Sequence, residues 1–270
     1  MDTSLNGKRA LITGAGDGIG REIAVAMARE GATVAVHGRS LVRIESTLAA
    51  IKAEGGTAIP ALADLVDEDA IATMCEDALS SLGGLDVLVN NAGIYAIDDT
   101  PTMTPETWKS ILNINLTAPF LVTRAVYSAL IDSGSDASVI FISSIAADAH
   151  TNGWGAYAAS KNGLNAYMHC LADELGAHGA RVNCIAPGWV ETKMAQEAHK
   201  DMAAAAGVDY DEAYNLNMRG NMLSALLTPD SISDMAVFLA SERGRFITAQ
   251  TLTVCGGNLP GSQIDDPGDD

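Results

Sequence analysis

Three residues in the second half of the chain have the types and the spacing of a proton-transfer site: Ser144, Tyr157 and Lys161. Tyr157 and Lys161 are four residues apart in a segment with helical character, so their side chains should share one helix face. A free tyrosine has a pKa of about 10, which is too high for ready proton exchange near neutrality. A nearby ammonium group stabilises the phenolate and lowers that pKa. Tyr157 could then exchange a proton with a substrate oxygen that Ser144 polarises.

A glycine-rich stretch near the N-terminus, "ALITGAGDGIGRE", follows a short apolar run and precedes a helical pattern. The free N–H groups at a helix N-terminus can hold a pyrophosphate, and glycines let the backbone approach it closely. The spacing differs from the G-x-G-x-x-G of the standard dinucleotide-binding turn, and a plain strand-to-helix turn is the alternative. The predicted cofactor contacts here are Gly14, Asp17, Gly18, Ile19 and Gly20.

Short apolar runs alternate with helix-length segments along most of the chain. The runs lack clean polar alternation, as expected for strands that are buried on both faces. Helical patterns cover 20–29, 43–53 and 157–175. This alternation predicts an α/β, doubly wound Rossmann fold with about seven parallel strands and helices on both faces. The candidate strands begin at Arg9, Thr33, Thr57, Leu85, Ser138, Arg181 and Thr251.

The chain reads as one domain over residues 1–258, followed by an acidic tail at 259–270. The segment 190–228 is rich in Met, Ala and Asn and looks irregular, so we interpret it as a substrate-loop insertion. In a doubly wound fold, such an insertion would lie outside the carboxyl ends of the strands, where ligands bind.

The composition of the chain indicates which partners and which cellular compartment to expect. The formal charge is −18, which argues against nucleic acid and against an acidic partner. No run of 18 apolar residues and no signal-peptide pattern is present, so we expect a cytoplasmic protein without a membrane partner. The four cysteines are far apart and form no C-x-x-C pair, so no metal site is predicted.

The glycine spacing T-G-x-x-x-G-x-G resembles that of the short-chain dehydrogenase/reductase family. Four further motifs support the resemblance: "NNAG" at 90–93, Ser144 followed by Y-x-x-x-K, "PGWVET" from Pro187 and "TLTVCGG" from Thr251. Together they cover about residues 5–258. The resemblance implies hydride transfer between a nicotinamide cofactor and a ketone or secondary alcohol, with Tyr157 as general acid or base.

The resemblance adds Asn115 as a fourth catalytic residue, whose carbonyl would hold a water in a proton relay to Lys161. Pro119 has no N–H, so it cannot bond the Asn115 carbonyl if the segment is helical. Our hypothesis is that Pro119 helps to leave this carbonyl free; the alternative is that it only marks a kink or boundary. The resemblance implies further cofactor contacts at Asp64, Leu65, Asn91, Gly93, Tyr157, Lys161, Pro187, Gly188, Val190 and Thr192. For Asp64, which matches the position that contacts the adenine amino group, the alternative is a plain helix cap.

The choice of cofactor depends on the end of the second strand, "VAVHGRS". NAD-preferring enzymes usually carry an acidic residue there for the ribose hydroxyls, but this chain has Gly38 followed by Arg39. A guanidinium can clamp a 2′-phosphate, so NADP(H) is favoured and NAD(H) remains possible. Asp17 argues the other way, because some NADP-binding relatives have a basic residue at its position.

Several residues carry weaker predictions. His150 and Trp154 lie between Ser144 and Tyr157, so they could line a substrate pocket or simply belong to a surface loop. Met side chains suit an apolar lid over such a pocket, although core packing is equally compatible. Cys255 stands where related chains often have an aspartate. The methionines in or beside the insertion are Met194, Met202, Met218 and Met222.

The predicted substrate is a small ketone or alcohol, apolar or cyclic in character. The main alternative is a 3-oxoacyl-[acyl-carrier-protein] reductase, which must dock an acidic carrier. The acidic ends of two long helices, "YSALIDSGSDAS" with Asp132 and Asp136 and "LADELGAHGA", together with the net charge, speak against such docking. A second alternative is a non-catalytic dinucleotide-binding protein. The resemblance also implies a homotetramer assembled through the helices that carry Asn115 and Tyr157.

Overall fold

The chain forms one parallel sheet of seven strands in the order β3-β2-β1-β4-β5-β6-β7. The computed structural model describes residues 3–148, 152–218, 221–223 and 226–258. All seven predicted strands are confirmed, with ends shifted by no more than a few residues, and so is the doubly wound fold. The strands are β1 Arg9–Ile12, β2 Thr33–Gly38, β3 Thr57–Leu62, β4 Val87–Asn90, β5 Ser138–Ile142, β6 Arg181–Pro187 and β7 Gln250–Val254.

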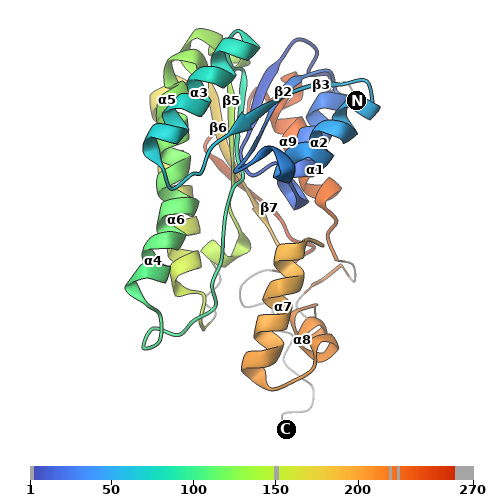
Figure 1. Ribbon diagram of the computed structural model, residues 1–270, viewed down its shortest axis with the longest axis vertical. Helices are drawn as coiled ribbons and strands as arrows, with labels where there is room; N and C mark the ends of the chain where they lie inside the picture. The colour runs from blue at the N-terminus through green and yellow to red at the C-terminus, as the bar shows by residue number, and fades with distance from the viewer. Residues whose placement is uncertain (1–2, 149–151, 219–220, 224–225, 259–270) are drawn as a thin grey trace.

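Helices cover both faces of this sheet (Figure 1). One face packs against α1, α2 and α9, and the other against α3, α5 and α6. Neighbouring side chains of β1 point to opposite faces of the sheet. Ile12 packs in the core on the side of α1, α2 and α9, and Leu11 packs in the core on the side of α3, α5 and α6. The α-helices are α1 Gly18–Arg29, α2 Leu41–Ala53, α3 Glu68–Leu82, α4 Pro105–Leu112, α5 Ala118–Ser133, α6 Gly155–Gly176, α7 Lys193–Ala206, α8 Tyr210–Met218 and α9 Pro229–Ala240.

The strand order reverses between β1 and β4, which are neighbours in the sheet although they are far apart in the sequence. At such a switch point the loops leave in opposite directions and open a crevice at the carboxyl ends of the strands. The glycine-rich loop follows β1, and Asn91 to Gly93 follow β4. The fold therefore places these two predicted cofactor segments side by side.

The segment 190–228 is more regular than the sequence analysis suggested. Its described part contains two helices, α7 and α8, which pack against each other. They lie beyond the end of the sheet, apart from the layers that cover its faces (Figure 1). The prediction of an irregular loop was wrong in this respect, because the Ala- and Met-rich stretch has good intrinsic helix propensity. The predicted tail at 259–270 lies outside the described residues.

The continuous helical stretch Pro105–Asp136 has the length and the mean hydropathy, 1.3, that a membrane span would need. By length and composition alone this is weak evidence, because core helices of globular proteins pass the same test. Here Val122, Val126 and Leu130 of α5 are fully buried against the sheet. Burial accounts for part of the apolar composition, since 39% of the most apolar window of this stretch is buried.

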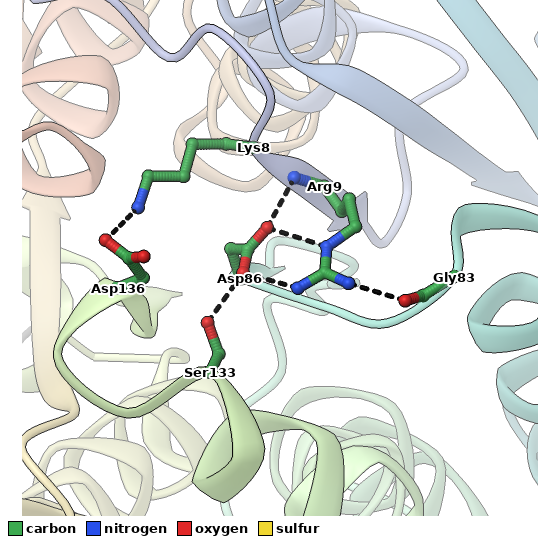
Figure 2. Close-up of polar contacts among 6 residues, drawn as sticks. All are labelled: Lys8, Arg9, Gly83, Asp86, Ser133 and Asp136. Atoms are coloured by element: carbon green, nitrogen blue, oxygen red, sulfur yellow. Dashed lines mark hydrogen bonds and ion pairs between the residues drawn. The ribbon is translucent and has the colours of Figure 1, made fainter.

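A network of ion pairs lies at the amino ends of the strands, where β1, β4 and β5 begin, on the edge of the sheet opposite the crevice (Figure 2). The guanidinium of Arg9 donates from Nε and Nη2 to the two carboxylate oxygens of Asp86, both at 2.8 Å. Ser133 Oγ, at the end of α5, donates to the same carboxylate at 2.6 Å. Nearby, Lys8 pairs with the exposed Asp136. The network ties the start of β1 to the start of β4 and to the end of α5.

We predict that Asp86→Asn lowers the free energy of unfolding by about 1 to 3 kcal/mol. This value lies between those for surface and buried ion pairs, because Asp86 is 5% exposed whereas Arg9 is only partly buried. Burial raises the pKa of Asp86, but hydrogen bonds from Arg9 and Ser133 outweigh it and leave the pKa below its ordinary value. A lowered carboxyl pKa stabilises the fold above the unfolded pKa of about 3.9, and this stability is lost as the pH falls through the folded pKa. The difference between wild type and variant, measured by urea unfolding, should therefore shrink on acidification.

The control is Asp136→Asn, which removes the exposed ion pair with Lys8 and should change stability by less than about 1 kcal/mol. Equal effects of the two substitutions would contradict the assignment of the stabilising role to Asp86.

Candidate active site

The glycine-rich loop has the backbone shape of a close-contact site. Gly14 has φ +64°, and a Cβ at this position would lie 2.8 Å from the Cα of Ala92. A Cβ on Gly20 would lie 2.3 Å from Nδ2 of Asn91. The loop therefore needs glycine at both positions, because the backbone of the neighbouring segment approaches it closely. A glycine-rich turn at a helix N-terminus fits the pyrophosphate of a dinucleotide; Ile19, in the first turn of α1, is partly buried against the core.

Asn91 holds this loop against the end of β4. Its Nδ2 donates to the carbonyls of Thr13 at 2.9 Å and Gly14 at 3.1 Å, and its N–H donates to Thr13 Oγ1 at 2.9 Å. The side-chain N–H groups of Asn91 are thus used within the protein. Any contact of Asn91 with a cofactor would have to come from its oxygens, so its main role here is to position the loop.

His37 is a positioning residue that the sequence analysis did not identify. It is 2% exposed, although it lies at the end of an otherwise apolar strand. Its Nδ1 accepts a hydrogen bond from Gly14 N at 3.0 Å, so Nε2 carries the proton and donates to the Ala63 carbonyl at 3.3 Å. Burial lowers the pKa of His37 to about 4, which keeps the ring neutral and preserves both bonds at neutral pH. The sequence did contain a signal for this role, because a histidine at the end of the otherwise buried run "TVAVH" needs hydrogen-bond partners.

Asp17 caps α1 and pairs with a residue far away in the sequence. Its carboxylate accepts from Gly18 N at 2.8 Å and forms an ion pair with Lys193 Nζ at 2.7 Å. Desolvation raises its pKa, but these two partners outweigh that effect and leave the pKa below its ordinary value. Lys193 thus offsets the negative charge of Asp17. The argument from Asp17 against NADP(H) is correspondingly weaker.

Two exposed arginines flank the end of β2. Arg39 follows Gly38 directly, and Arg43 lies in the first turn of α2. A Cβ on Gly38 would lie 2.5 Å from Ile44 Cγ2, so the packing of α2 leaves no room there for an acidic side chain. Neither arginine forms an ion pair within the described part of the chain. Arg43 is a second candidate for phosphate binding that the sequence analysis missed, although "GRSLVR" contains it.

Asp64 lies at the carboxyl end of β3, as predicted, but it is not a helix cap. Asp67 caps α3 instead, because its carboxylate accepts from the N–H groups of Asp69 and Ala70, both at 3.0 Å. Asp64 is exposed and organises the turn by accepting from Val66 N at 3.3 Å. Leu65, beside it, is 7% exposed. The helix-cap alternative for Asp64 is therefore excluded.

The loop after β6 continues into α7 and closes one side of the crevice. Gly188 N donates to the Val254 carbonyl at 2.9 Å, and a Cβ on Gly188 would lie 2.8 Å from Cys255 Cα. Thr192 caps α7 by accepting from Ala195 N at 3.2 Å. A Cβ on Gly18 would lie 3.2 Å from Thr192 Cγ2, so this cap faces the glycine loop. Cys255 is a buried free thiol packed against Gly188, and Pro187 and Val190 complete the loop.

The structure brings the predicted catalytic residues together at the carboxyl ends of β4 and β5. Ser144 follows β5 and Gly93 follows β4, while Tyr157 and Lys161 share a face of α6. Lys161 Nζ lies 5.6 Å from the centroid of the Tyr157 ring and donates to the Ile142 carbonyl at 2.8 Å. A Cβ on Gly93 would lie 3.5 Å from Lys161 Nζ, so glycine keeps the space beside the ammonium open.

The phenol of Tyr157 has a raised pKa in the protein without cofactor. Burial raises it above the ordinary value, and a hydrogen bond with Ser144 only partly opposes this shift. Burial also lowers the pKa of Lys161, which is 3% exposed, to about 8. In the protein without cofactor, Lys161 Nζ bonds a main-chain carbonyl and the desolvation of the phenol dominates. The lowering of the Tyr157 pKa by the ammonium together with an oxidised nicotinamide stays a prediction for the complex. The neutral phenol is well suited to donate a proton to a developing alkoxide.

The side chain of Asn115 is fully buried and fully bonded. Its Oδ1 accepts from Ile94 N at 2.8 Å, and its Nδ2 donates to the Ile94 carbonyl at 2.8 Å and to Ser160 Oγ at 3.0 Å. The main-chain carbonyl is therefore the group of Asn115 that remains for a proton relay. Asn115 lies in a π-helical turn, Asn113–Thr117, and Pro119 is the second residue of α5, which follows directly. The hypothesis that Pro119 frees this carbonyl stays a prediction.

Trp154 joins Tyr157 to a small cluster of aromatic rings. Trp154 packs edge-to-face on the Tyr157 ring, with centroids 5.5 Å apart, and it stacks on Tyr95 at 5.9 Å. Trp189 contacts Trp154 at 6.1 Å. The pocket interpretation of Trp154 is thus supported, whereas His150 lies outside the described residues. Tyr95 and Trp189 were missed, although "PGWVET" contains the tryptophan.

The predicted methionine lid has little support. Met194 and Met222 are 41% and 71% exposed, and neither contributes to the cavity beside α7. Met202 and Met218 instead accept hydrogen bonds at sulfur from Asn217 and Asn221, both at 3.5 Å. Aromatic side chains, rather than methionines, give the site its apolar wall.

The sequence and the fold of this chain were compared with those of known proteins. The family profile described as short chain dehydrogenase matches residues 8–203. The 3-oxoacyl-[acyl-carrier-protein] reductase FabG of Chlamydia pneumoniae is 32% identical over 95% of this chain and 99% of its own length. An uncharacterised NAD-dependent oxidoreductase of Mycobacterium tuberculosis is 33% identical over 95% and 97%. A solved structure from Beutenbergia cavernae with NADP bound at low occupancy has a TM-score of 0.87 at 32% identity, covering 96% of this chain and 99% of that one.

The family assignment combines the profile match, which covers most of the sheet, with the gathering of Ser144, Tyr157 and Lys161 beside a glycine-rich loop. The chain belongs to the short-chain dehydrogenase/reductase family and is an oxidoreductase.

Proposed function

We propose that the protein is an NADP(H)-dependent oxidoreductase that interconverts a secondary alcohol and a ketone. The observation that carries this proposal is the position of the Tyr157 phenol, between Ser144 and the buried ammonium of Lys161. For reduction, a bound NADPH would supply the hydride that the carbonyl carbon needs. Tyr157 then donates its proton to the carbonyl oxygen, which Ser144 holds and polarises. Lys161 and the Asn115 carbonyl would return a proton to Tyr157 from solvent.

The walls of the site favour a compact apolar or cyclic substrate. Trp154 packs on Tyr157, and Tyr95 and Trp189 pack on Trp154. Flat aromatic walls bind ring systems well, because the contact area is large and little side-chain entropy is lost.

Two observations support NADP(H) as the cofactor. The end of β2 offers the exposed cations Arg39 and Arg43, and the packing against Ile44 excludes a competing carboxylate at Gly38. In addition, Lys193 offsets the charge of Asp17 at the pyrophosphate end. NAD(H) is the alternative, and the NAD-dependent relative from Mycobacterium tuberculosis supports it.

We predict that Arg39→Ala raises the KM for NADPH by about tenfold to a hundredfold and changes the KM for NADH by less than about threefold. The reason is that a charge-assisted hydrogen bond to phosphate contributes about 1.5 to 3 kcal/mol, and NADH lacks this phosphate. Initial rates with both cofactors measure the effect. Arg29→Ala, which removes an exposed arginine paired with Glu54 at the far end of α1, is the control. Equal losses with the two cofactors would contradict the role of Arg39.

The second candidate is reduction of a 3-oxoacyl group on acyl carrier protein, which the FabG relative favours. The local charges used against it in the sequence analysis are misplaced. Asp132 lies in the last turn of α5, and Asp136 lies in the short 3-10 helix that follows it. Both are on the sheet edge opposite the site, because helices of a parallel α/β fold end where the next strand begins; Figure 2 shows Asp136 there. The argument now rests on exposed acidic residues in the loop after β4 and in α8: Asp99, Asp211 and Glu212. Such a surface would repel an acidic carrier.

A cofactor-oxidation screen tests both candidates. NADPH and NADH are each combined with cyclic ketones, aryl ketones and a 3-oxoacyl thioester on carrier protein. We expect the fastest turnover with NADPH and a ring-bearing ketone. Faster turnover with NADH would overturn the cofactor assignment, and efficient reduction of the carrier-bound group would overturn the substrate assignment.

We further propose a homotetramer that acts in the cytoplasm without nucleic-acid or membrane partners. The helices α4 and α5 expose Trp108 and Phe120, each 41% exposed, which suits a contact between subunits. Sedimentation at several protein concentrations would test the assembly.

A further inference from the structure

The loop after β4 and the helix α7 meet at a side-chain hydrogen bond. The hydroxyl group of Tyr95 donates to Oδ2 of Asp201 at 2.9 Å, although the two residues are 106 positions apart in the sequence. Tyr95 lies two residues after Gly93, and Asp201 lies in the third turn of α7. Burial raises the pKa of Tyr95, and the hydrogen bond with Asp201 raises it further, so the phenol stays a donor at neutral pH.

The ring of Tyr95 is stacked on Trp154. The two centroids are 5.9 Å apart and the planes are inclined by 22°. Trp154 in turn packs edge-to-face on Tyr157, with centroids 5.5 Å apart. Aromatic pairs prefer defined relative orientations, so the position of each ring restricts the next one. Asp201 is thereby connected to the phenol of Tyr157 through two rings.

Trp154 also holds the start of α6, the helix that carries Tyr157. It occupies the N-cap position, and in the described part of the chain it forms no side-chain cap hydrogen bond. Its carbonyl accepts from Ala158 N at 2.8 Å, so it belongs to the first turn of this helix. The packing of the Trp154 ring fixes this turn, together with a main-chain bond from Asp98 N to the Gly153 carbonyl at 2.9 Å.

We propose that Tyr95 is a positioning residue: its bond to Asp201 holds the ring against Trp154, and Trp154 holds the Tyr157 hydroxyl group in place. The proposal rests on the proposed function, since it concerns the position of the general acid. Proton transfer depends on the distance and alignment of donor and acceptor, so a small displacement of the phenol lowers the rate. Tyr95 and Asp201 act through other residues and exchange no proton with the substrate.

Steady-state kinetics with an active ketone test the effect on the reaction. Tyr95→Phe retains the ring and removes the hydroxyl group, and Asp201→Ala removes the acceptor. We expect each variant to lower kcat about threefold to tenfold, the factor that one net hydrogen bond provides, and to leave the Kd for NADPH within about twofold. The double variant should lose no more than either single variant, because both changes remove the same bond. Losses that multiply in the double variant would contradict the proposal.

Two further variants separate the hydrogen bond from the charge. Asp201→Asn keeps an oxygen acceptor and should retain most of the activity. Glu197→Ala is the matched control, since Glu197 is an exposed carboxylate one turn earlier on α7 and also acts on Tyr95 through its charge. It should leave kcat unchanged. If Asp201→Asn or Glu197→Ala lost as much activity as Asp201→Ala, the effect would belong to the charge and the proposal would be overturned.

A second measurement needs no turnover. The ¹H–¹⁵N signal of the Trp154 indole, assigned with Trp154→Phe, reports the surroundings of this ring in the full-length protein. Asp201 contacts Tyr95, and Tyr95 contacts Trp154, so a shift of the signal in Asp201→Ala should pass through Tyr95. We expect this shift in the wild-type background and its absence in the Tyr95→Phe background. A signal that Asp201→Ala leaves in place, or moves equally in both backgrounds, would overturn the proposal.

The two measurements separate this proposal from the proposed function. A wild type that reduces no ketone would contradict the proposed function, and the indole signal would still decide whether the bond holds the Trp154 ring. Normal ketone reduction by Tyr95→Phe would contradict the positioning role alone.

Discussion

Replacing Tyr157 with phenylalanine is expected to lower kcat for ketone reduction by a factor of about 10² to 10⁴, which is the usual contribution of a positioned general acid. This factor corresponds to about 3 to 5 kcal/mol of transition-state stabilisation. The phenol is the proton donor nearest to the site that Ser144 polarises, and burial keeps it protonated at neutral pH. Without the hydroxyl group, the developing alkoxide would have to take its proton from water.

The Tyr157→Phe variant tests the chemistry rather than the fold. Phenylalanine retains the ring that packs on Trp154 at 5.5 Å, so the pocket wall and the unfolding temperature should change little. Cofactor affinity, measured by NADPH fluorescence, should stay within about threefold, and kcat carries the loss.

The control for this variant is Tyr167→Phe, a tyrosine on the same helix that packs against Phe120 and Phe141. It should retain activity within about twofold. If Tyr157→Phe kept more than about a tenth of the wild-type activity, the general-acid assignment would be wrong. An unchanged rate would instead favour a non-catalytic, dinucleotide-binding role for this fold.

The convergence of Ser144, Tyr157 and Lys161 could be predicted because it follows from local rules. A spacing of four residues places Tyr157 and Lys161 on one helix face, and parallel strands place their carboxyl ends at one edge. The same rule about edges would have placed Asp132 and Asp136 at the opposite edge. These two carboxylates therefore carry no information about the charge at the mouth of the site, and this could have been predicted from the sequence.

Other features depend on contacts between distant segments. No local pattern joins Asp17 to Lys193, or Asn91 to the Gly14 carbonyl, because these pairs form only when the loops after β1, β4 and β6 meet. The direction of the pKa shift of Tyr157 in the protein without cofactor could not be predicted for a related reason. Its sign depends on how much desolvation opposes the ammonium, and burial is a property of the folded chain.

The buried charge of Lys161 leads to the second large effect. We predict that Lys161→Met lowers kcat by about 10²-fold, equivalent to about 2.7 kcal/mol. Methionine is similar in length and apolar, so it should fill the space of a side chain that is 3% exposed. It leaves the Ile142 carbonyl without its donor, which costs about 1 to 3 kcal/mol of stability. The control is Lys200→Met, the same replacement at an exposed position on α7.

The pH profile of alcohol oxidation separates a catalytic role of Lys161 from a structural one. Oxidation requires the Tyr157 phenolate, so its rate should rise with pH. The Lys161 ammonium stabilises the phenolate only while it is protonated, and burial lowers the pKa of Lys161 to about 8. Below this pH the ammonium is present in the wild type and absent from the variant. The rise in rate should therefore occur at higher pH in Lys161→Met than in the wild type or in Lys200→Met. If the variant lost activity with an unshifted profile, Lys161 would only support the packing of α6 against β5.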